Sequence, residues 1–115
     1  MSDAAQEPEP AYHLILHSEE VPVTRAALRL FISDEAHEPQ IRGLAREVLA
    51  ELEAEPDTEG RVTVSLAPEQ MKITHSAVSL LLGDLQRGQA AERKTLRSIL
   101  EKLPDEHAIR AITLD

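Results

Sequence analysis

The segment with the greatest density of metal-ligating groups is a short acidic stretch. Asp34, Glu35, His37 and Glu38 fall within five consecutive positions. Carboxylates and an imidazole on one loop can coordinate a divalent cation. Acidic loops of this kind are more often simply hydrated, so the metal site is an alternative hypothesis. In that reading the protein is a small metal-dependent enzyme or a metal-binding sensor.

A second pair of imidazoles lies upstream of this stretch. His13 and His17 are four residues apart in an expected strand, so their side chains point to the same face. Two histidines without a third ligand at a compatible spacing are weak evidence for a metal site. We therefore expect this face of the strand to be hydrated.

The sequence lacks the common motifs of cofactor binding and nucleophilic catalysis. Its four glycines do not form a phosphate-binding loop, and no serine lies in a G-x-S-x-G pattern. Cysteine and tryptophan are absent, and the chain has one tyrosine and one phenylalanine. This composition argues against thiol chemistry and against a large cofactor pocket. We expect no cofactor, and the sequence favours a non-enzymatic role.

The elements that position these residues follow from the spacing of apolar side chains. Residues 12–17 alternate as a strand, a helix ends near residue 34, and a second helix covers residues 39–52 with one apolar stripe. The pattern then begins again. Its second round comprises a strand at 61–66, helices at 68–85 and 89–103, and a closing strand at 109–114.

This restart is an internal duplication of the sequence. At an offset of 50 positions the identical pairs include Leu16/Leu66, Glu19/Glu69, Thr24/Thr74, Ala27/Ala77, Leu30/Leu80 and Asp34/Asp84. One extra residue in the second helix–helix loop changes the offset to 51 for the last helix. The strand, the loops and both helices stay in step through that insertion, which indicates a repeated unit.

One difference between the two copies predicts a difference in structure. Pro22 stands where the second copy has Lys72. Proline lacks the backbone N–H and costs about 3 kcal/mol inside a helix. The first helix should therefore start later than its counterpart or be bent.

These patterns predict an α+β fold, a two-layer domain built from a tandem duplicated strand–helix–helix unit with pseudo-twofold symmetry. The expected order is β-α-α-β-α-α-β, with a sheet hydrated on one face. Residues 1–10 are expected to form a flexible acidic N-terminal tail. Residues 11–115 should form a single domain of two repeats, at about 11–60 and 61–115.

The overall composition argues against several classes of protein. The chain has 115 residues and a net charge of −9, which disfavours a nucleic-acid partner. No apolar run approaches the roughly 20 residues of a membrane-spanning helix. The first ten residues lack the pattern of a signal peptide, so we expect a cytoplasmic protein.

An apolar run within each first helix suggests a surface for self-association. Three consecutive apolar positions cover about 200° of a helix, which is more than one core contact needs. The leading hypothesis is therefore a non-enzymatic interaction or structural module that forms a homodimer through its helices. The residues expected at this interface are Leu28, Phe31, Ile32, Leu81 and Leu82.

The distribution of charge supports a further alternative. Residues 1–60 hold 14 acidic and four basic side chains, whereas residues 61–115 hold seven and eight. Acidic charge of this kind can steer a basic protein into contact. The chain would then be an acidic regulator of a basic partner, and that partner should meet the first half.

Overall fold

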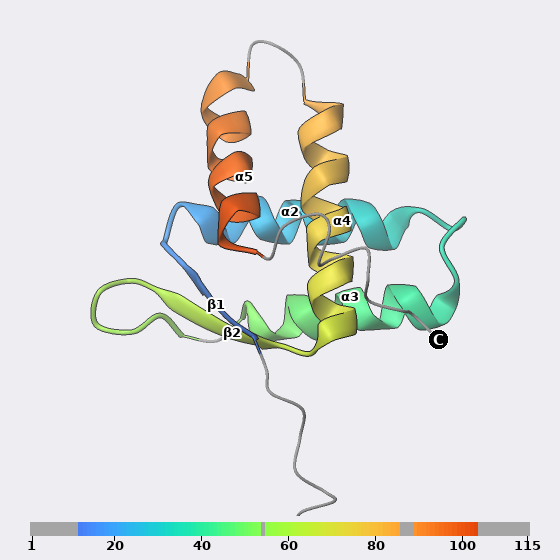
Figure 1. Cartoon of the computed structure of the whole chain (residues 1–115), viewed down its shortest axis with the longest axis horizontal. Coiled ribbons are helices and arrows are strands. Elements are labelled where there is room, and N and C mark those ends of the chain that lie inside the picture. Colours follow the sequence, from blue (N-terminus) through green and yellow to red (C-terminus); the bar gives the residue numbers. More distant parts are fainter. Residues whose placement is uncertain (1–11, 54, 86–88, 104–115) are drawn as a thin grey trace, which may run out of the picture.

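The computed structural model describes residues 12–53, 55–85 and 89–103. It is an α+β arrangement of a two-stranded antiparallel sheet and four helices in the described residues (Figure 1). The elements agree with the predicted ranges to within one residue wherever both ends were predicted. They are β1 (Tyr12–Leu16), α2 (Glu20–Ser33), α3 (Pro39–Glu51), β2 (Val62–Leu66), α4 (Pro68–Asp84) and α5 (Ala90–Lys102).

The two strands have one buried and one exposed face, as their alternating sequences predict. Leu14 pairs with Val64 at the centre of the sheet, and both side chains are buried. The side chains that alternate with them, such as His13 and Thr63, are exposed. The sheet is therefore hydrated on one side and packed against the helices on the other.

The start of α2 shows the effect of Pro22. At the sequence offset of 50, the first residue of α4, Pro68, corresponds to position 18, but α2 begins at Glu20. Pro22 then lies in the first turn, where the backbone N–H has no partner within the helix. The prediction that the first helix starts later than its counterpart is confirmed.

The two central helices begin with the same backbone contact. The His17 N–H donates to Glu20 Oε1 over 2.8 Å, and the Ala67 N–H donates to Gln70 Oε1 over 2.9 Å. In α4 this contact is half of a capping box, because Ala67 is the N-cap residue and Gln70 is the third residue of the helix. In α2 the N-cap residue is Glu19 and Glu20 is the first residue of the helix, so the equivalent contact lies just before the helix begins. The carboxylate and the amide both fix the angle at which the strand enters the helix.

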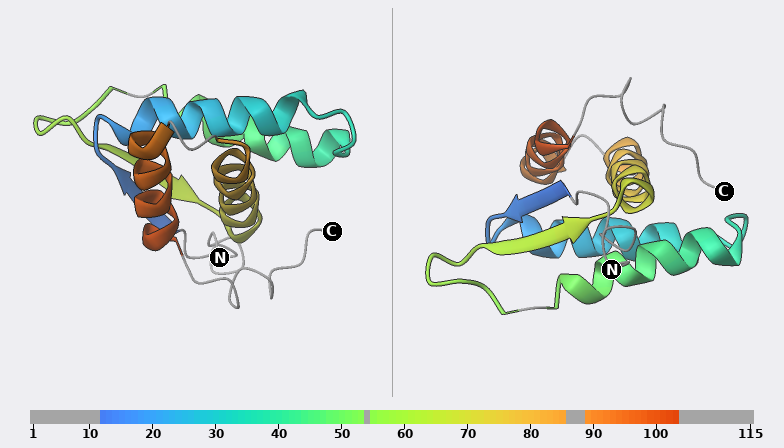
Figure 2. Two further views of the ribbon diagram at one scale, coloured as in Figure 1. Left: turned by 90° about the horizontal axis from the view of Figure 1, so that it is seen from above. Right: turned by 60° about the horizontal axis from the view of Figure 1, so that its bottom comes forward.

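The hydrophobic core lies between the inner face of the sheet and the helices. Helices α2 and α4 pack against each other, and each also contacts α3 and α5. The α4–α5 pair stands across the α2–α3 pair, as Figures 1 and 2 show. The largest fully buried side chains are Leu14, Leu16, Leu28, Leu52, Leu66, Ile73, Leu96 and Ile99.

Two predicted segments lie outside the described residues. They are the N-terminal tail at residues 1–10 and the closing strand at 109–114.

The connection from α3 to β2 contains Gly60, whose φ of 79° suits glycine because it has no Cβ. This connection loops away from the helices before it enters β2 (Figure 1).

Candidate functional site

The acidic stretch between α2 and α3 forms a compact turn. Asp34 Oδ1 accepts a hydrogen bond from the Ala36 N–H, and the Asp34 carbonyl accepts one from the His37 N–H. The His37 ring stacks on Phe31, with 4.0 Å between the ring centroids. His37 Nε2 is 3.7 Å from Asp34 Oδ2. These contacts hold the turn against the end of α2.

Of the four proposed metal ligands, this turn brings together only Asp34 and His37. Glu35 and Glu38 are exposed. Within the described parts of the chain, no group of three His, Asp or Glu side chains is placed to hold a metal ion. The contacts of this turn therefore hold the His37 imidazole on the Phe31 ring.

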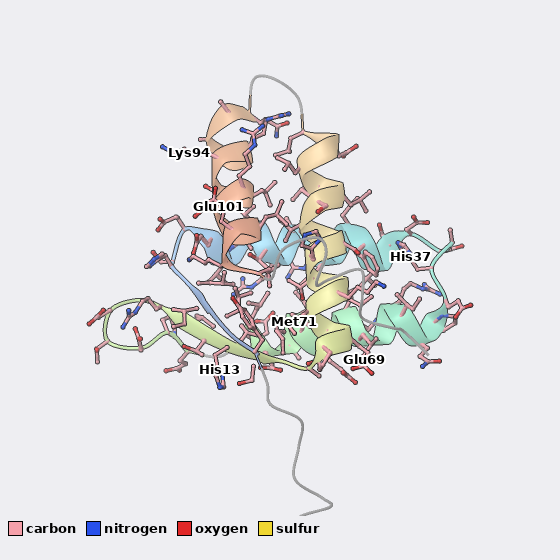
Figure 3. All side chains as sticks on the ribbon, in the orientation of Figure 1. His13, His37, Glu69, Met71, Lys94 and Glu101 are labelled. Carbon is pink, nitrogen blue, oxygen red and sulfur yellow. The ribbon has the colours of Figure 1, made fainter. Side chains whose placement is uncertain are left out.

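The other histidine pair lies on the exposed face of the sheet. His13 Nδ1 is 3.2 Å from Ser65 Oγ on the neighbouring strand. His13 and His37 lie on opposite sides of the molecule in Figure 3, so the two imidazole groups do not form a common site. His17 is exposed at the end of β1.

The expected interface residues differ in their exposure. Leu28 and Phe31 are buried in the core, whereas Ile32, Leu81 and Leu82 are half-buried. Leu80 has 43 % of its surface exposed, a large fraction for a leucine. It begins the apolar run at residues 80–82 of α4, although the residues expected at the interface do not include it.

A buried ion pair joins the start of α2 to the end of α5. Glu20 is only 3 % exposed, and its Oε1 lies 2.5 Å from Lys102 Nζ. Its other oxygen accepts a hydrogen bond from Ser98 Oγ. Burial alone would raise the pKa of Glu20, but the hydrogen bonds from Lys102, the His17 N–H and Ser98 lower the pKa below its ordinary value.

The sequence gives little sign of this pair, because its members are 82 positions apart. A glutamate in the first turn of a helix normally suggests only a favourable contact with the helix dipole. The sequence does place Lys102 in the last turn of the predicted final helix, but it does not identify a carboxylate partner for it. Its partner could be identified only after the helices were placed.

A small cavity lies beside the start of α2 and is lined by residues from three parts of the chain. Its volume is about 220 Å³. Arg25 of α2 reaches into this region and donates from Nη2 to the Leu52 carbonyl over 3.4 Å. Arg25 Nε is buried and has no hydrogen-bond partner in the described structure. The apolar lining comes from Val21, Pro22, Leu52, Pro56 and Val62.

The turn that closes one side of this cavity is held by Asp57. Its Oδ1 accepts hydrogen bonds from the N–H groups of Glu59 and Arg61, over 2.8 and 2.9 Å. These two backbone donors lower the pKa of the Asp57 carboxyl. The Arg61 side chain also pairs with Glu59, so the turn carries a local network of charges.

None of the helices in the described ranges is long and apolar enough to cross a membrane. Comparisons with protein-family models, with curated proteins and with solved structures find no match for this chain.

Proposed function

We propose that this protein is a non-enzymatic interaction module that forms a homodimer through the apolar surface of α4 and the end of α2. The observation that carries this proposal is the exposure of Leu80 beside two half-buried leucines, Leu81 and Leu82. Ile32 at the end of α2 is half-buried as well. A second copy that covers these side chains would remove apolar area from water.

The proposed architecture beneath this surface is a duplicated unit with a pseudo-twofold axis through the sheet. The register supports it, because Leu14 and Val64 are equivalent at the offset of 50 and pair with each other. Thr24 and Thr74 are equivalent and buried, and each donates its hydroxyl to the carbonyl four residues earlier. The hydrogen bonds from the His17 N–H to Glu20 and from the Ala67 N–H to Gln70 also join equivalent positions.

Contacts between the two proposed units support the same axis. Lys102 Nζ donates to the Ile15 carbonyl of β1, and Glu51 Oε1 accepts from the Ser65 N–H of β2. Glu51 and Lys102 correspond at the offset of 51, and Ile15 and Ser65 correspond at the offset of 50. Equivalent positions are thus joined in both contacts, but the helix side chain donates in one and accepts in the other. This is expected when two copies keep their geometry and diverge in charge.

A charge placed on the apolar surface tests the proposed interface. Leu80→Glu should convert the dimer to a monomer, because association would bury a carboxylate without a partner. Ala50→Glu is the matched control, since it adds the same charge at an exposed position of α3. Sedimentation velocity should give a monomer for the first variant and a dimer for the second.

Two results would contradict the proposed interface. One is a dimer that is unaffected by Leu80→Glu, and the other is equal dissociation of both variants. Far-ultraviolet circular dichroism of each variant separates a lost interface from a lost fold.

A further inference from the structure

We infer that the cavity beside the start of α2 binds an apolar side chain of a basic polypeptide segment. This inference goes beyond the proposed function, because it concerns other residues and a partner other than a second copy. It rests on the size and lining of the cavity, on the incomplete bonding of Arg25, and on the charges around the opening.

The cavity has the size and chemistry of a pocket for one side chain. Its volume of about 220 Å³ is small for a cofactor. A dry apolar cavity of about 150 Å³ accommodates benzene, so this space accepts a leucine or phenylalanine side chain. Val21 and Val62 are buried, and together with Leu52 and two prolines they give the pocket apolar walls.

Arg25 supplies an unused hydrogen-bond donor at this pocket. Its only hydrogen bond among the described residues is the long one to the Leu52 carbonyl, and its Nε is buried without a hydrogen-bond partner. A buried donor without an acceptor destabilises the free protein, so a ligand that brings an acceptor is favoured. The backbone carbonyl next to an inserted side chain is such an acceptor.

The turn on one side of the pocket is held by hydrogen bonds within the chain. The turn on one side is fixed by the two hydrogen bonds to Asp57 Oδ1 and by a third between the Asp57 N–H and the Arg61 carbonyl. Gly60 of this turn lies beside Ser18, and both residues line the pocket. A turn fixed by its own hydrogen bonds loses less entropy on binding than one that must order.

The charges around the opening decide between two classes of ligand. Glu19, Glu53 and Glu55 are exposed, each adjoins a lining residue in the sequence, and no ion pair neutralises them within the described residues. Asp57 and Glu59 share Arg61. Arg25 alone would suit a small carboxylate, but this acidic surround repels free anions and attracts lysine and arginine. A basic chain with an apolar residue can pair its cationic side chains with the exposed carboxylates and place the apolar side chain in the pocket.

Capped synthetic peptides test this inference directly. The probe is a five-residue peptide with leucine at its centre and lysine at the other four positions, carrying a fluorescent label. Fluorescence anisotropy should show saturable binding that weakens as salt is added. Replacing the central leucine by alanine should weaken binding about tenfold, because the apolar contact is lost. A peptide with glutamate in place of lysine should not bind.

Variants of Arg25 locate the site. Arg25→Met keeps the length of the side chain but removes its donors, and it should weaken binding of the leucine peptide about tenfold. Arg29→Met is the matched control, because Arg29 is exposed one turn later on α2 and does not line the pocket. The control should bind as the native chain does.

Three outcomes would overturn the inference. They are equal binding of the leucine and alanine peptides, equal loss in both arginine variants, and tight binding of 4-methylpentanoate in place of the peptides. The last result would identify the pocket as a site for small carboxylates. Leu80→Glu should leave peptide binding unchanged, so failure of the dimer and failure of this site remain distinguishable.

Discussion

At the scale of single residues, the contact with the largest consequence is the ion pair between Glu20 and Lys102. Glu20 is buried, whereas Lys102 keeps 27 % of its side chain exposed. Removing one partner of a buried pair leaves a charge without compensation. The lysine also donates to the Ile15 carbonyl, so it joins α5 to both α2 and β1.

Replacing Lys102 should therefore destabilise the protein. Lys102→Met should lower the free energy of unfolding by about 1–3 kcal/mol, a value reduced from that of a fully buried pair because the lysine is partly hydrated. Lys94→Met is the matched control on the same helix, since Lys94 is exposed and lies near the start of α5, whereas Lys102 is its last residue. The control should change stability by less than about 0.5 kcal/mol. Urea denaturation measures both values, and equal effects would contradict the role of the pair.

The same residue predicts how stability depends on pH. Because the pKa of Glu20 is lower in the folded protein, the unfolded chain binds more protons as the pH falls below the ordinary carboxyl value of about 4.3. The stabilisation by Glu20 is thus present above that value and is lost as the pH falls through the folded-state pKa.

Glu20→Gln should reduce this acid sensitivity. Its free energy of unfolding should fall less steeply than that of the native chain as the pH drops below about 4.3. Asp57, whose pKa is also lowered, should account for part of the slope that remains. Urea denaturation at a series of pH values checks this prediction. Identical slopes for the two proteins would contradict it.

At the scale of the elements, the outer edges of the two strands are each contacted by a side chain from a helix. Glu51 at the end of α3 accepts the Ser65 N–H of β2, and Lys102 of α5 donates to β1. Unpaired strand edges are templates for intermolecular pairing. A charged side chain bound to the edge opposes the approach of a second strand.

Removing the glutamate should therefore promote aggregation. Glu51→Ala frees the Ser65 N–H and should shorten the time before aggregates that bind thioflavin appear on mild heating. Glu53→Ala is the control, since Glu53 is exposed two residues later and makes no hydrogen bond to β2 in the described residues. A control that aggregates as quickly as Glu51→Ala would show that loss of negative charge alone is responsible.

The elements themselves could be predicted well from the sequence. Alternation located both described strands, and helical stripes located α3 and α5 to within one residue. Pro22 predicted the late start of α2. These features depend on neighbours within about four positions, which a sequence shows directly.

The contacts between elements could not be predicted in the same way. The partner of Lys102, the cavity at Arg25 and the burial of Leu28 relative to Leu80 all depend on how the helices cross. A run of consecutive apolar residues shows that several sides of a helix avoid water, but not which side meets the core. Proximity in the sequence does not ensure proximity in space either. The four ligand-type residues of the acidic stretch are close in the sequence, but only Asp34 and His37 come together in the structure.

At the scale of the whole molecule, the two proposed units differ in their surfaces. The apolar positions of the described helices and strands correspond at the sequence offsets of 50 and 51, while the acidic charge is concentrated in residues 1–60. The proposed dimer surface uses the apolar residues of α4 and α2. The pocket at Arg25 lies within the acidic half, where a basic segment is attracted.

The mass of the full chain in solution tests the central proposal most directly. Light scattering during gel filtration should give twice the monomer mass of 12.7 kDa, with the dimer giving way to monomer on dilution. A mass of 12.7 kDa that stays constant up to the highest concentration reached would contradict self-association through the apolar surface.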